Sequence, residues 1–178
     1  MPLSPCRERH TMPEIVYRHA IEDDLPRLLE IYNDVICEGG FTADLEPYNL
    51  EQRRAWFEAH RDAPFLVYVL ETGQGVVGYF YFSPWRSGRA ALARVAEVSY
   101  YLAKEARGKG LGHDMLRQAE TVARGAGMNY LVAILLESNS ASRALLEKGG
   151  FSRAGLFPEI ADLGDRLCGQ LLMYKRLT

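Results

Sequence analysis

Residues 107–112 read Arg-Gly-Lys-Gly-Leu-Gly, between an apolar run, Val95–Leu102, and an amphipathic helix pattern that starts near Leu111. A strand, a glycine-rich turn and a helix present a row of backbone N–H groups at a helix N-terminus. These groups and the helix dipole both favour an anion. Arg107 and Lys109 add positive charge at the same place. The stretch therefore predicts a phosphate-binding loop.

The spacing of this loop differs from the two common nucleotide-binding motifs. A nucleoside-triphosphatase loop needs Ser or Thr directly after its lysine, as a magnesium ligand, but Gly110 follows Lys109. A dinucleotide motif needs G-x-G-x-x-G in the first strand–helix turn, whereas Gly108, Gly110 and Gly112 give G-x-G-x-G past the middle of the chain. The remaining alternative is that the glycines only shape a turn.

The composition is that of one globular domain. The chain has 178 residues, 48% of them hydrophobic, which suffices for one sizeable core. The formal net charge of -2 gives no reason to expect nucleic-acid binding, and the apolar runs are too short to span a membrane. The three cysteines and four histidines lack metal-ligand spacing, so we expect no metal and a reducing cytoplasm. We expect a disordered tail over residues 1–13 and a single domain over residues 14–178.

Hydrophobic periodicity predicts an α+β fold with a mixed sheet. We expect helices that begin at residues 25, 50, 111 and 140 and end at Gly39, His60, Gly125 and Lys148. We expect strands over residues 15–18, 65–71, 76–83, 95–102, 130–136, 151–157 and 167–177. The early strands follow one another as a meander and the later ones alternate with helices.

The order of these parts resembles the GCN5-related N-acetyltransferase (GNAT) superfamily. Its loop, Arg/Gln-x-x-Gly-x-Gly/Ala, is matched by Arg107, Gly110 and Gly112, and Asn139 and the E-K-G-G-F segment at residues 147–151 follow in order. The resemblance implies a central, mostly antiparallel twisted sheet flanked by helices. It also implies that the loop holds the pyrophosphate of acetyl-CoA, the co-substrate.

Further segments resemble one branch of this superfamily, the phosphinothricin and methionine-sulfoximine acetyltransferases. They are Ile31-Tyr32-Asn33, Thr42 with Glu46-Pro47, Arg53 to Trp56-Phe57, Trp85-Arg86, and Glu97 with Ser99. The resemblance covers about residues 14–177 and implies a homodimeric enzyme that moves the acetyl group to a small amino-acid-like amine by direct attack. The alternatives are a protein or peptide N-acetyltransferase and a non-catalytic acyl-CoA-binding module.

The resemblance also implies which residues contact the cofactor. The main chain of Tyr100, Tyr101 and Leu102 would pair with the pantetheine arm where their strand splays from its neighbour, and one N–H would polarise the thioester oxygen. The pyrophosphate would be held by Arg107, Gly108, Lys109, Gly110, Leu111 and Gly112. Asn139 matches a pantetheine-contacting asparagine, although a role as helix N-cap explains it equally well.

Glu97 is the candidate general base. It interrupts an otherwise apolar strand, where burying a carboxylate is costly and raises its pKa towards the working pH. Alternation along the strand places Glu97, Ser99 and Tyr101 on one face. The alternative is that this face simply points to solvent.

The acceptor is expected near the loop that precedes this strand. In the resembled branch the loop borders the acceptor pocket, and Arg86 is suited to hold a carboxylate by a bidentate pair. The alternative is a surface loop with one packed tryptophan. The residues expected to bind the acceptor are Phe41, Thr42, Trp85, Arg86, Ser87 and Glu97.

Two departures from the resembled branch concern the leaving group and the acceptor. Leu146 stands where many relatives have a Tyr or His thought to protonate the leaving thiolate, so we expect no side-chain acid at that position. Residues 161–167 lack the aromatic-rich stretch of the best-known members. The resemblance therefore does not extend to all residues that would select the herbicide phosphinothricin.

Overall fold

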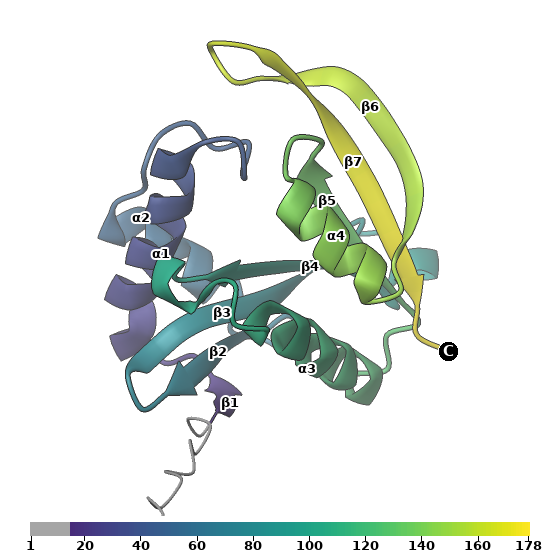
Figure 1. The fold of residues 1–178 in the computed structure, drawn as a ribbon. Helices are drawn as coiled ribbons and strands as arrows, with labels where there is room; N and C mark the ends of the chain where they lie inside the picture. Colours follow the sequence, from purple (N-terminus) through teal and green to yellow (C-terminus); the bar gives the residue numbers. More distant parts are fainter. Residues whose placement is uncertain (1–14) are drawn as a thin grey trace, which may run out of the picture.

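The computed structural model describes residues 15–178, so the expectation of a disordered tail over residues 1–13 lies outside them. Within the described residues, one seven-stranded sheet has the order β1-β2-β3-β4-β5-β7-β6 (Figure 1). Its strands are β1 (Val16–His19), β2 (Val67–Thr72), β3 (Gly75–Pro84), β4 (Val95–Leu102), β5 (Tyr130–Leu136), β6 (Ser152–Asp162) and β7 (Leu167–Arg176). Only β4 and β5 pair in parallel. The sheet is therefore mixed and mostly antiparallel, as predicted.

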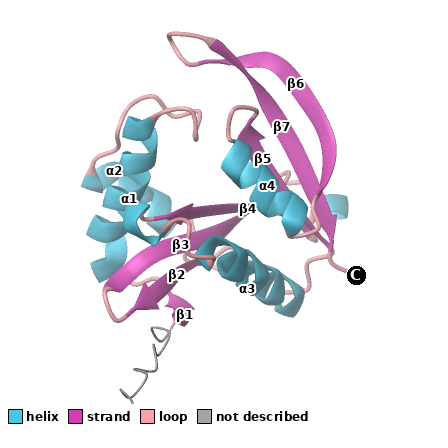
Figure 2. Cartoon of the chain, viewed as in Figure 1, coloured by secondary structure: helices cyan, strands magenta, loops and turns pink. Residues whose placement is uncertain are grey.

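Four α-helices of the described chain cover the two faces of this sheet (Figure 2). They are α1 (Leu25–Glu38), α2 (Leu50–Glu58), α3 (Leu111–Gly125) and α4 (Ser140–Lys148), and the short 3-10 helices are η1 (Glu22–Asp24), η2 (Ala90–Leu92) and η3 (Lys104–Ala106). Helices α1 and α2 pack on one face, and α3 and α4 pack on the other. The layered α+β arrangement follows because each amphipathic helix buries its apolar side on the sheet.

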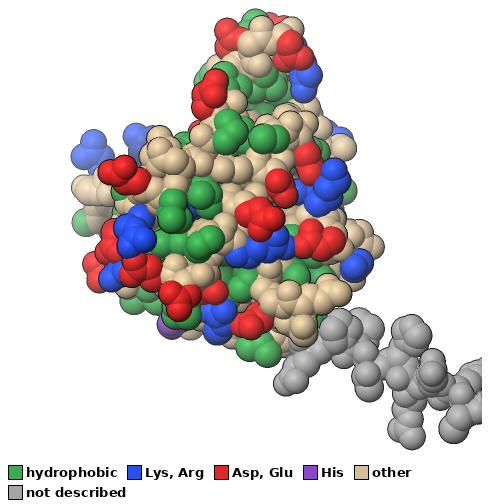
Figure 3. All heavy atoms as spheres, turned by 90° about the vertical axis from the view of Figure 1, so that its left-hand side faces the viewer, with side chains coloured by type: hydrophobic (Ala, Val, Ile, Leu, Met, Phe, Trp, Pro, Cys, Tyr) green, Lys and Arg blue, Asp and Glu red, His purple; other side chains and the backbone are tan. Residues whose placement is uncertain are grey.

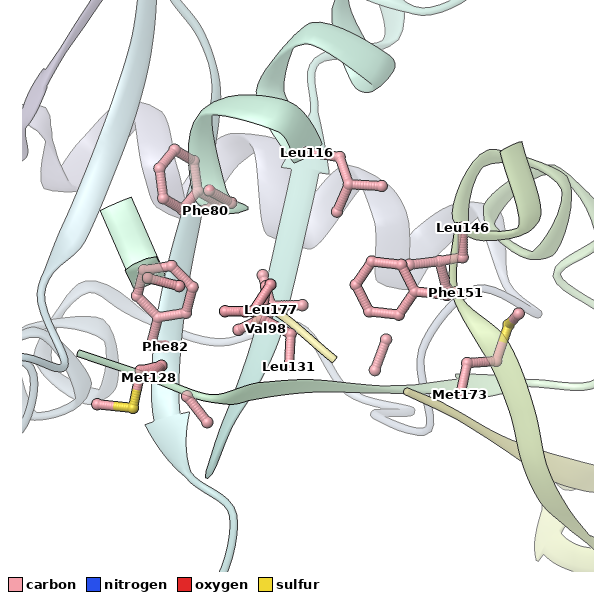
Figure 4. Packing of buried hydrophobic residues seen from close by; sticks show 14 of the residues in the cluster. Phe80, Phe82, Val98, Leu116, Met128, Leu131, Leu146, Phe151, Met173 and Leu177 are labelled. Carbon is pink, nitrogen blue, oxygen red and sulfur yellow. The ribbon is translucent and has the colours of Figure 1, made fainter. Parts of the chain in front are cut away.

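Two clusters of buried side chains fill these layers. On the α3/α4 face, Phe80 and Phe82 of β3 and Val98 of β4 pack against Leu116 of α3 and Leu146 of α4 (Figure 4). On the other face, α1 and α2 cover a cluster that contains Tyr79 of β3, which is fully buried. Strand β3 thus contributes to both layers, because alternate side chains of this strand point to opposite faces.

Local signals explain the helix starts. Asn49 accepts a hydrogen bond from the backbone N–H of Gln52, and the Gln52 side chain accepts one from the N–H of Asn49, which completes a capping box for α2. A proline stands at the start of α1, where its missing N–H costs nothing. Helix α2 ends at Glu58 rather than at His60 as predicted, and the predicted starts of β1 and β2 are one and two residues too early.

The closing hairpin is longer than the sequence pattern predicts. Strand β6 continues to Asp162, whereas we expected it to end at Phe157. Pro158 has no N–H for the ladder, and the pairing shifts between Phe157 and Ala161, where Glu159 has a φ of 52°. The bulge lets the strand resume pairing with β7, so the hairpin extends away from the body of the molecule (Figure 1).

Charges of both signs are interspersed on the face that carries α1 and α2 (Figure 3). Arg61 pairs with Glu58 at 2.7 Å and with Glu22 at 3.7 Å, and Arg54 also pairs with Glu22. These contacts tie α2 to η1. None of the helices formed by residues 15–178 is long and apolar enough to cross a membrane.

Gly78 permits the close approach of β3 to β4. A Cβ at this position would lie 2.6 Å from Cδ2 of Leu102 and 2.9 Å from the carbonyl oxygen of Tyr101. The leucine side chain can turn away, but the carbonyl can move only if β4 shifts. Gly78→Ala is therefore expected to lower the free energy of unfolding by about 1–3 kcal/mol, measured by urea denaturation.

Gly73→Ala in the β2–β3 turn is the matched control. A Cβ at Gly73 would have nothing within 4 Å, and a surface change of this kind is expected to stay within about 0.5 kcal/mol. Equal destabilisation by the two substitutions would contradict the steric explanation for Gly78.

Candidate cofactor and acceptor site

A cavity opens where β4 and β5 separate. The two strands pair only from Val95 to Glu97 on β4 and from Tyr130 to Val132 on β5. Beyond this point they diverge, and a cavity of about 430 Å³ lies between them, the loop before α3, and α4. The backbone edge of residues 98–102 of β4 is therefore left open towards the cavity.

The loop before α3 has the backbone geometry of an anion site. Gly108 and Gly110 have φ values of 74° and 82°, and Gly110 is the N-cap of α3. These left-handed conformations favour glycine, which explains why alternate residues of the loop are glycines. The first N–H groups of α3 have no acceptor within the helix and point out of its N-terminus. Both glycines line the cavity.

The Arg107 guanidinium is held in place by two contacts with the described residues. Its Nε donates to the carbonyl oxygen of Leu102 at 3.0 Å, and its Nη1 pairs with Oε2 of Glu38 at 2.5 Å. Its Nη2 is buried and has no hydrogen-bond partner in residues 15–178. Arg107 lines the cavity, and an unpaired buried donor of this kind suits an anionic ligand.

Most of the residues predicted to contact the cofactor meet at this cavity. The predicted residues that line it are Tyr100, Tyr101, Leu102, Arg107, Gly108, Gly110, Gly112 and Asn139. Lys109 and Leu111 belong to the same loop but are not among the lining residues. Asn139 is also the N-cap of α4, because its Oδ1 accepts from the backbone N–H of Ser142 at 3.0 Å. The two explanations of Asn139 are thus compatible.

A pair of hydroxyl groups inside the cavity was not predicted. The hydroxyls of Tyr100 on β4 and Ser142 on α4 lie 2.6 Å apart, and both residues line the cavity. Burial raises the pKa of Tyr100 to about 12, so its phenol keeps its proton. Leu146 lines the same cavity and is buried. The contact joins residues that are far apart in the sequence, and no local pattern marks it.

Glu97 lies on the other face of β4, with Ser99 and Tyr101. Tyr101 packs against Tyr32 and Tyr79 at ring-centroid distances of 4.9 and 5.2 Å, so this is the face covered by α1 and α2. Glu97 is half-buried, and burial raises the pKa of its carboxyl group. It has no ion-pair or hydrogen-bond partner that the described residues provide. The face does not simply point to solvent.

Polar side chains on α2 and directly after it also reach this face. They were not predicted from the sequence as functional residues. Arg53 is only 5% exposed, its guanidinium lies 3.5 Å from the ring centroid of Trp56, and its Nη2 donates to the Tyr79 hydroxyl at 2.6 Å. His60 follows α2 and contacts Ser83. The available signal was the spacing of Arg53, Trp56 and His60, which places them on one side of a helix.

The residues predicted to bind the acceptor are dispersed. Phe41 lines the cavity, but Thr42 does not, and its hydroxyl lies 3.2 Å from that of Tyr32. Trp85 follows β3, and its backbone N–H donates to the carbonyl oxygen of Val95 at 3.3 Å. Residues 85–87 and Glu97 are not among the lining residues of the cavity, and Arg86 and Ser87 are exposed.

In the part of the chain that the structure describes, no three His, Cys, Asp or Glu side chains are grouped so that they could hold a metal ion. The cavity instead presents backbone edges, hydroxyls and one guanidinium. Such groups suit an extended ligand that carries phosphate at one end.

Comparisons with known proteins agree with this geometry. The family model of the acetyltransferase (GNAT) domain matches residues 14–152. The Bacillus subtilis protein YwnH is 38% identical over 149 residues, 84% of this chain and 91% of that protein. The L-methionine sulfoximine/L-methionine sulfone acetyltransferase of Pseudomonas aeruginosa is 36% identical over 77% of this chain and 80% of that protein. The structure of a phosphinothricin acetyltransferase from Sinorhizobium meliloti in complex with AcCoA superposes with a TM-score of 0.85 at 27% identity, covering 91% of this chain and 88% of that one.

Proposed function

The chain belongs to the GNAT acetyltransferase family and is an acetyl-CoA-dependent N-acetyltransferase, and we propose that its acceptor is the amine of a small amino-acid-like molecule with a free carboxylate. The observation that supports acetyl-CoA as the co-substrate is the cavity between β4, β5 and α4, which ends at a glycine loop suited to a pyrophosphate. Relatives named for methionine sulfoximine and phosphinothricin, both amino-acid analogues, support the class of acceptor.

The cofactor would lie along the cavity from the loop to the open edge of β4. The N–H groups of residues 108–112, including those of Lys109 and Leu111, would bind the pyrophosphate with Nη2 of Arg107. The main chain of residues 100–102 and the side chain of Asn139 would hold the pantetheine arm. All of these residues except Lys109 and Leu111 line one cavity, which supports this assignment. Fixing the thioester in this way lowers the entropic part of the barrier.

Glu97 would act as the general base. Acetyl-CoA supplies an acetyl thioester, and the acceptor must lose an ammonium proton before its nitrogen can attack. The carboxylate of Glu97 would take that proton directly or through a water, and its half-buried position with a raised pKa supports this role. A backbone N–H of β4 would stabilise the negative charge that develops on the carbonyl oxygen.

The carboxylate of the acceptor would be held near the start of β4. Arg86 would form the bidentate pair, with Trp85 and Ser87 beside it, and Phe41 and Thr42 would approach from the segment after α1. Arg86 is exposed and lies two positions after Pro84, the last residue of β3, which pairs with Ala96. This exposure supports its access to a ligand.

A panel of acceptors tests the proposal. The protein is incubated with acetyl-CoA and with amino acids, methionine sulfoximine, phosphinothricin, polyamines or peptides, and release of free thiol is followed. We expect turnover with an amino-acid-like amine and a loss of at least about tenfold in kcat/KM when its carboxylate is converted to an amide, because an Arg–carboxylate pair is lost. Turnover of peptides alone would favour a protein acetyltransferase. Tight acetyl-CoA binding without turnover would favour a non-catalytic module.

We further propose a metal-independent homodimer that works in the cytoplasm. The extended β6–β7 hairpin carries Phe157, Ile160 and Leu167, which are 52%, 57% and 57% exposed, and such apolar side chains support burial against a second copy. The described cysteines, Cys37 and Cys168, are free, which agrees with a reducing compartment.

A further inference from the structure

His60 and Ser83 form a contact for which the acetyl-transfer scheme has no role. The ring of His60 packs between Trp56 and Tyr81, with centroids 4.9 Å from each. Its Nδ1 lies 2.8 Å from the carbonyl oxygen of Trp56, and its Nε2 lies 3.3 Å from Oγ of Ser83. Both ring nitrogens therefore have a defined partner, one on α2 and one on β3.

The partner of Nδ1 determines the tautomer of His60. A carbonyl oxygen can only accept a hydrogen bond, so Nδ1 carries the proton and Nε2 of the neutral ring is an acceptor. Burial lowers the pKa of His60, and the charge of Arg53 lowers it further, so the ring is neutral near pH 7. Ser83 must then donate its single hydroxyl proton to His60. Only the lone pairs of its oxygen remain for other neighbours.

The other neighbour of Ser83 is Glu97. The two residues are directly opposite in the β3–β4 ladder and share the sheet face that α1 and α2 cover. The structure shows no direct hydrogen bond between the Glu97 carboxyl group and Ser83 among the described residues. Opposite residues on one face have Cβ atoms about 4.5–5.5 Å apart, so a rotation of the side chain or one bridging water joins the two groups. Arg53 of α2 and Tyr81 of β3 face His60, whereas burial is the cause of the raised pKa of Glu97 on β4.

We propose that His60 is a positioning residue for Glu97. Because it accepts the hydrogen bond of the Ser83 hydroxyl group, the serine oxygen faces the Glu97 carboxyl group as an acceptor. The inference rests on the proposed function, in which Glu97 is the base. When Glu97 takes a proton from the acceptor ammonium, the N–H bond breaks and an O–H bond forms on the carboxyl group. That O–H donates to Oγ of Ser83, so the arrangement stabilises the protonated base and not the carboxylate.

A titration of Glu97 in the acceptor-free protein tests this arrangement. The pKa is read from the carboxyl ¹³C shift of labelled glutamate, assigned by its loss in Glu97→Gln. His60→Phe keeps an aromatic ring between Trp56 and Tyr81 but has no acceptor nitrogen, so Ser83 is free to donate to the Glu97 carboxylate. We expect the pKa of Glu97 to fall by about 0.5–1 unit, the value of one hydrogen bond.

A double-mutant cycle separates positioning from packing. In a Ser83→Ala background, His60→Phe should leave the pKa of Glu97 unchanged, because His60 acts through the serine hydroxyl. His19→Phe is the matched control, since His19 makes a similar edge contact with Tyr68 at 4.7 Å but lies on β1 at the far edge of the sheet. An unchanged pKa in His60→Phe, or an equal fall with and without Ser83, would overturn the inference.

Two further comparisons keep the test decisive. If His60→Phe does not fold, two serine variants replace it. Ser83→Thr keeps the hydroxyl group and should retain the wild-type pKa of Glu97, whereas Ser83→Ala should lower it. Equal pKa values in these two variants would overturn the inference. Because the readout is a titration, it does not depend on which acceptor is used. Failure of the acceptor panel would contradict the proposed function and leave this measurement unaffected.

Discussion

Replacing Glu97 by glutamine is expected to lower kcat/KM for the acceptor by about 100-fold or more, which is typical of the loss of a general base. Glutamine keeps the size of the side chain and its place opposite Ser83 but cannot take a proton. The measurement is the initial rate of thiol release from acetyl-CoA at limiting acceptor, compared between the two proteins at one pH.

The pH profile identifies the group that is lost. The base works only when it is ionised, so kcat/KM rises with pH through the pKa of Glu97 and falls below it. Burial raises that pKa above its ordinary value, so the acidic limb should lie at higher pH than for an exposed glutamate. In Glu97→Gln this limb should disappear. An acidic limb that stays in place would show that the base lies elsewhere.

Stability provides the internal control for this substitution. A carboxyl group whose pKa is raised on folding favours the folded state at low pH, and its contribution is lost as the pH rises through the raised pKa. Above the raised pKa, the buried carboxylate destabilises the folded state. Glu97→Gln removes this destabilisation, so the melting temperature near pH 7 should not fall. Glu71→Gln is the matched control for activity, because Glu71 is a carboxylate on β2 of the same sheet and pairs with Arg18.

The parts of the site that could be predicted are those encoded by neighbouring residues. The glycines of residues 107–112, the apolar strand Val95–Leu102 and the helix Ser140–Lys148 have the predicted bounds because turn chemistry and periodicity act locally. The face of β4 that carries Glu97 followed from alternation in the same way. The cavity where β4 leaves β5 came from the resemblance and from no property of the segment itself.

The contacts that could not be predicted join distant segments. Glu38 and Arg107 are 69 positions apart. The loop motif marked Arg107 as a candidate ligand of phosphate, but Glu38 alone reads as an ordinary surface charge. The spacing of Arg53 and Trp56 places them on one side of a helix, but it does not show that Arg53 is buried against Trp56. The extension of β6 past Pro158 depends on pairing across a bulge with β7. In each case the placement of the residue or strand depends on a contact with a distant segment and not on its own local sequence.

Replacing Arg107 by alanine is expected to raise the Kd for acetyl-CoA by about 10- to 100-fold, the effect of losing one charge-assisted hydrogen bond. Arg107 lines the cavity, and its Nη2 is buried without a partner among the described residues. Its Nε and Nη1 hold the side chain in place through Leu102 and Glu38. A pre-positioned donor loses little conformational entropy on binding, so its removal is costly. Isothermal titration at fixed ionic strength measures the change.

The ion pair with Glu38 adds an effect that must be separated from this one. Without Arg107, the Glu38 carboxylate is left beside the site of a negatively charged ligand and repels it. Arg107→Ala/Glu38→Gln removes that repulsion, and Kd should stay well above the wild-type value if Nη2 binds the pyrophosphate. Lys104→Ala is the charge-matched control, since Lys104 lies 3.8 Å from Glu38 but is 77% exposed and does not line the cavity. A double variant with wild-type affinity, or equal weakening by Lys104→Ala, would mean that Arg107 acts only as a general positive charge, because a specific donor cannot be replaced by the removal of a carboxylate.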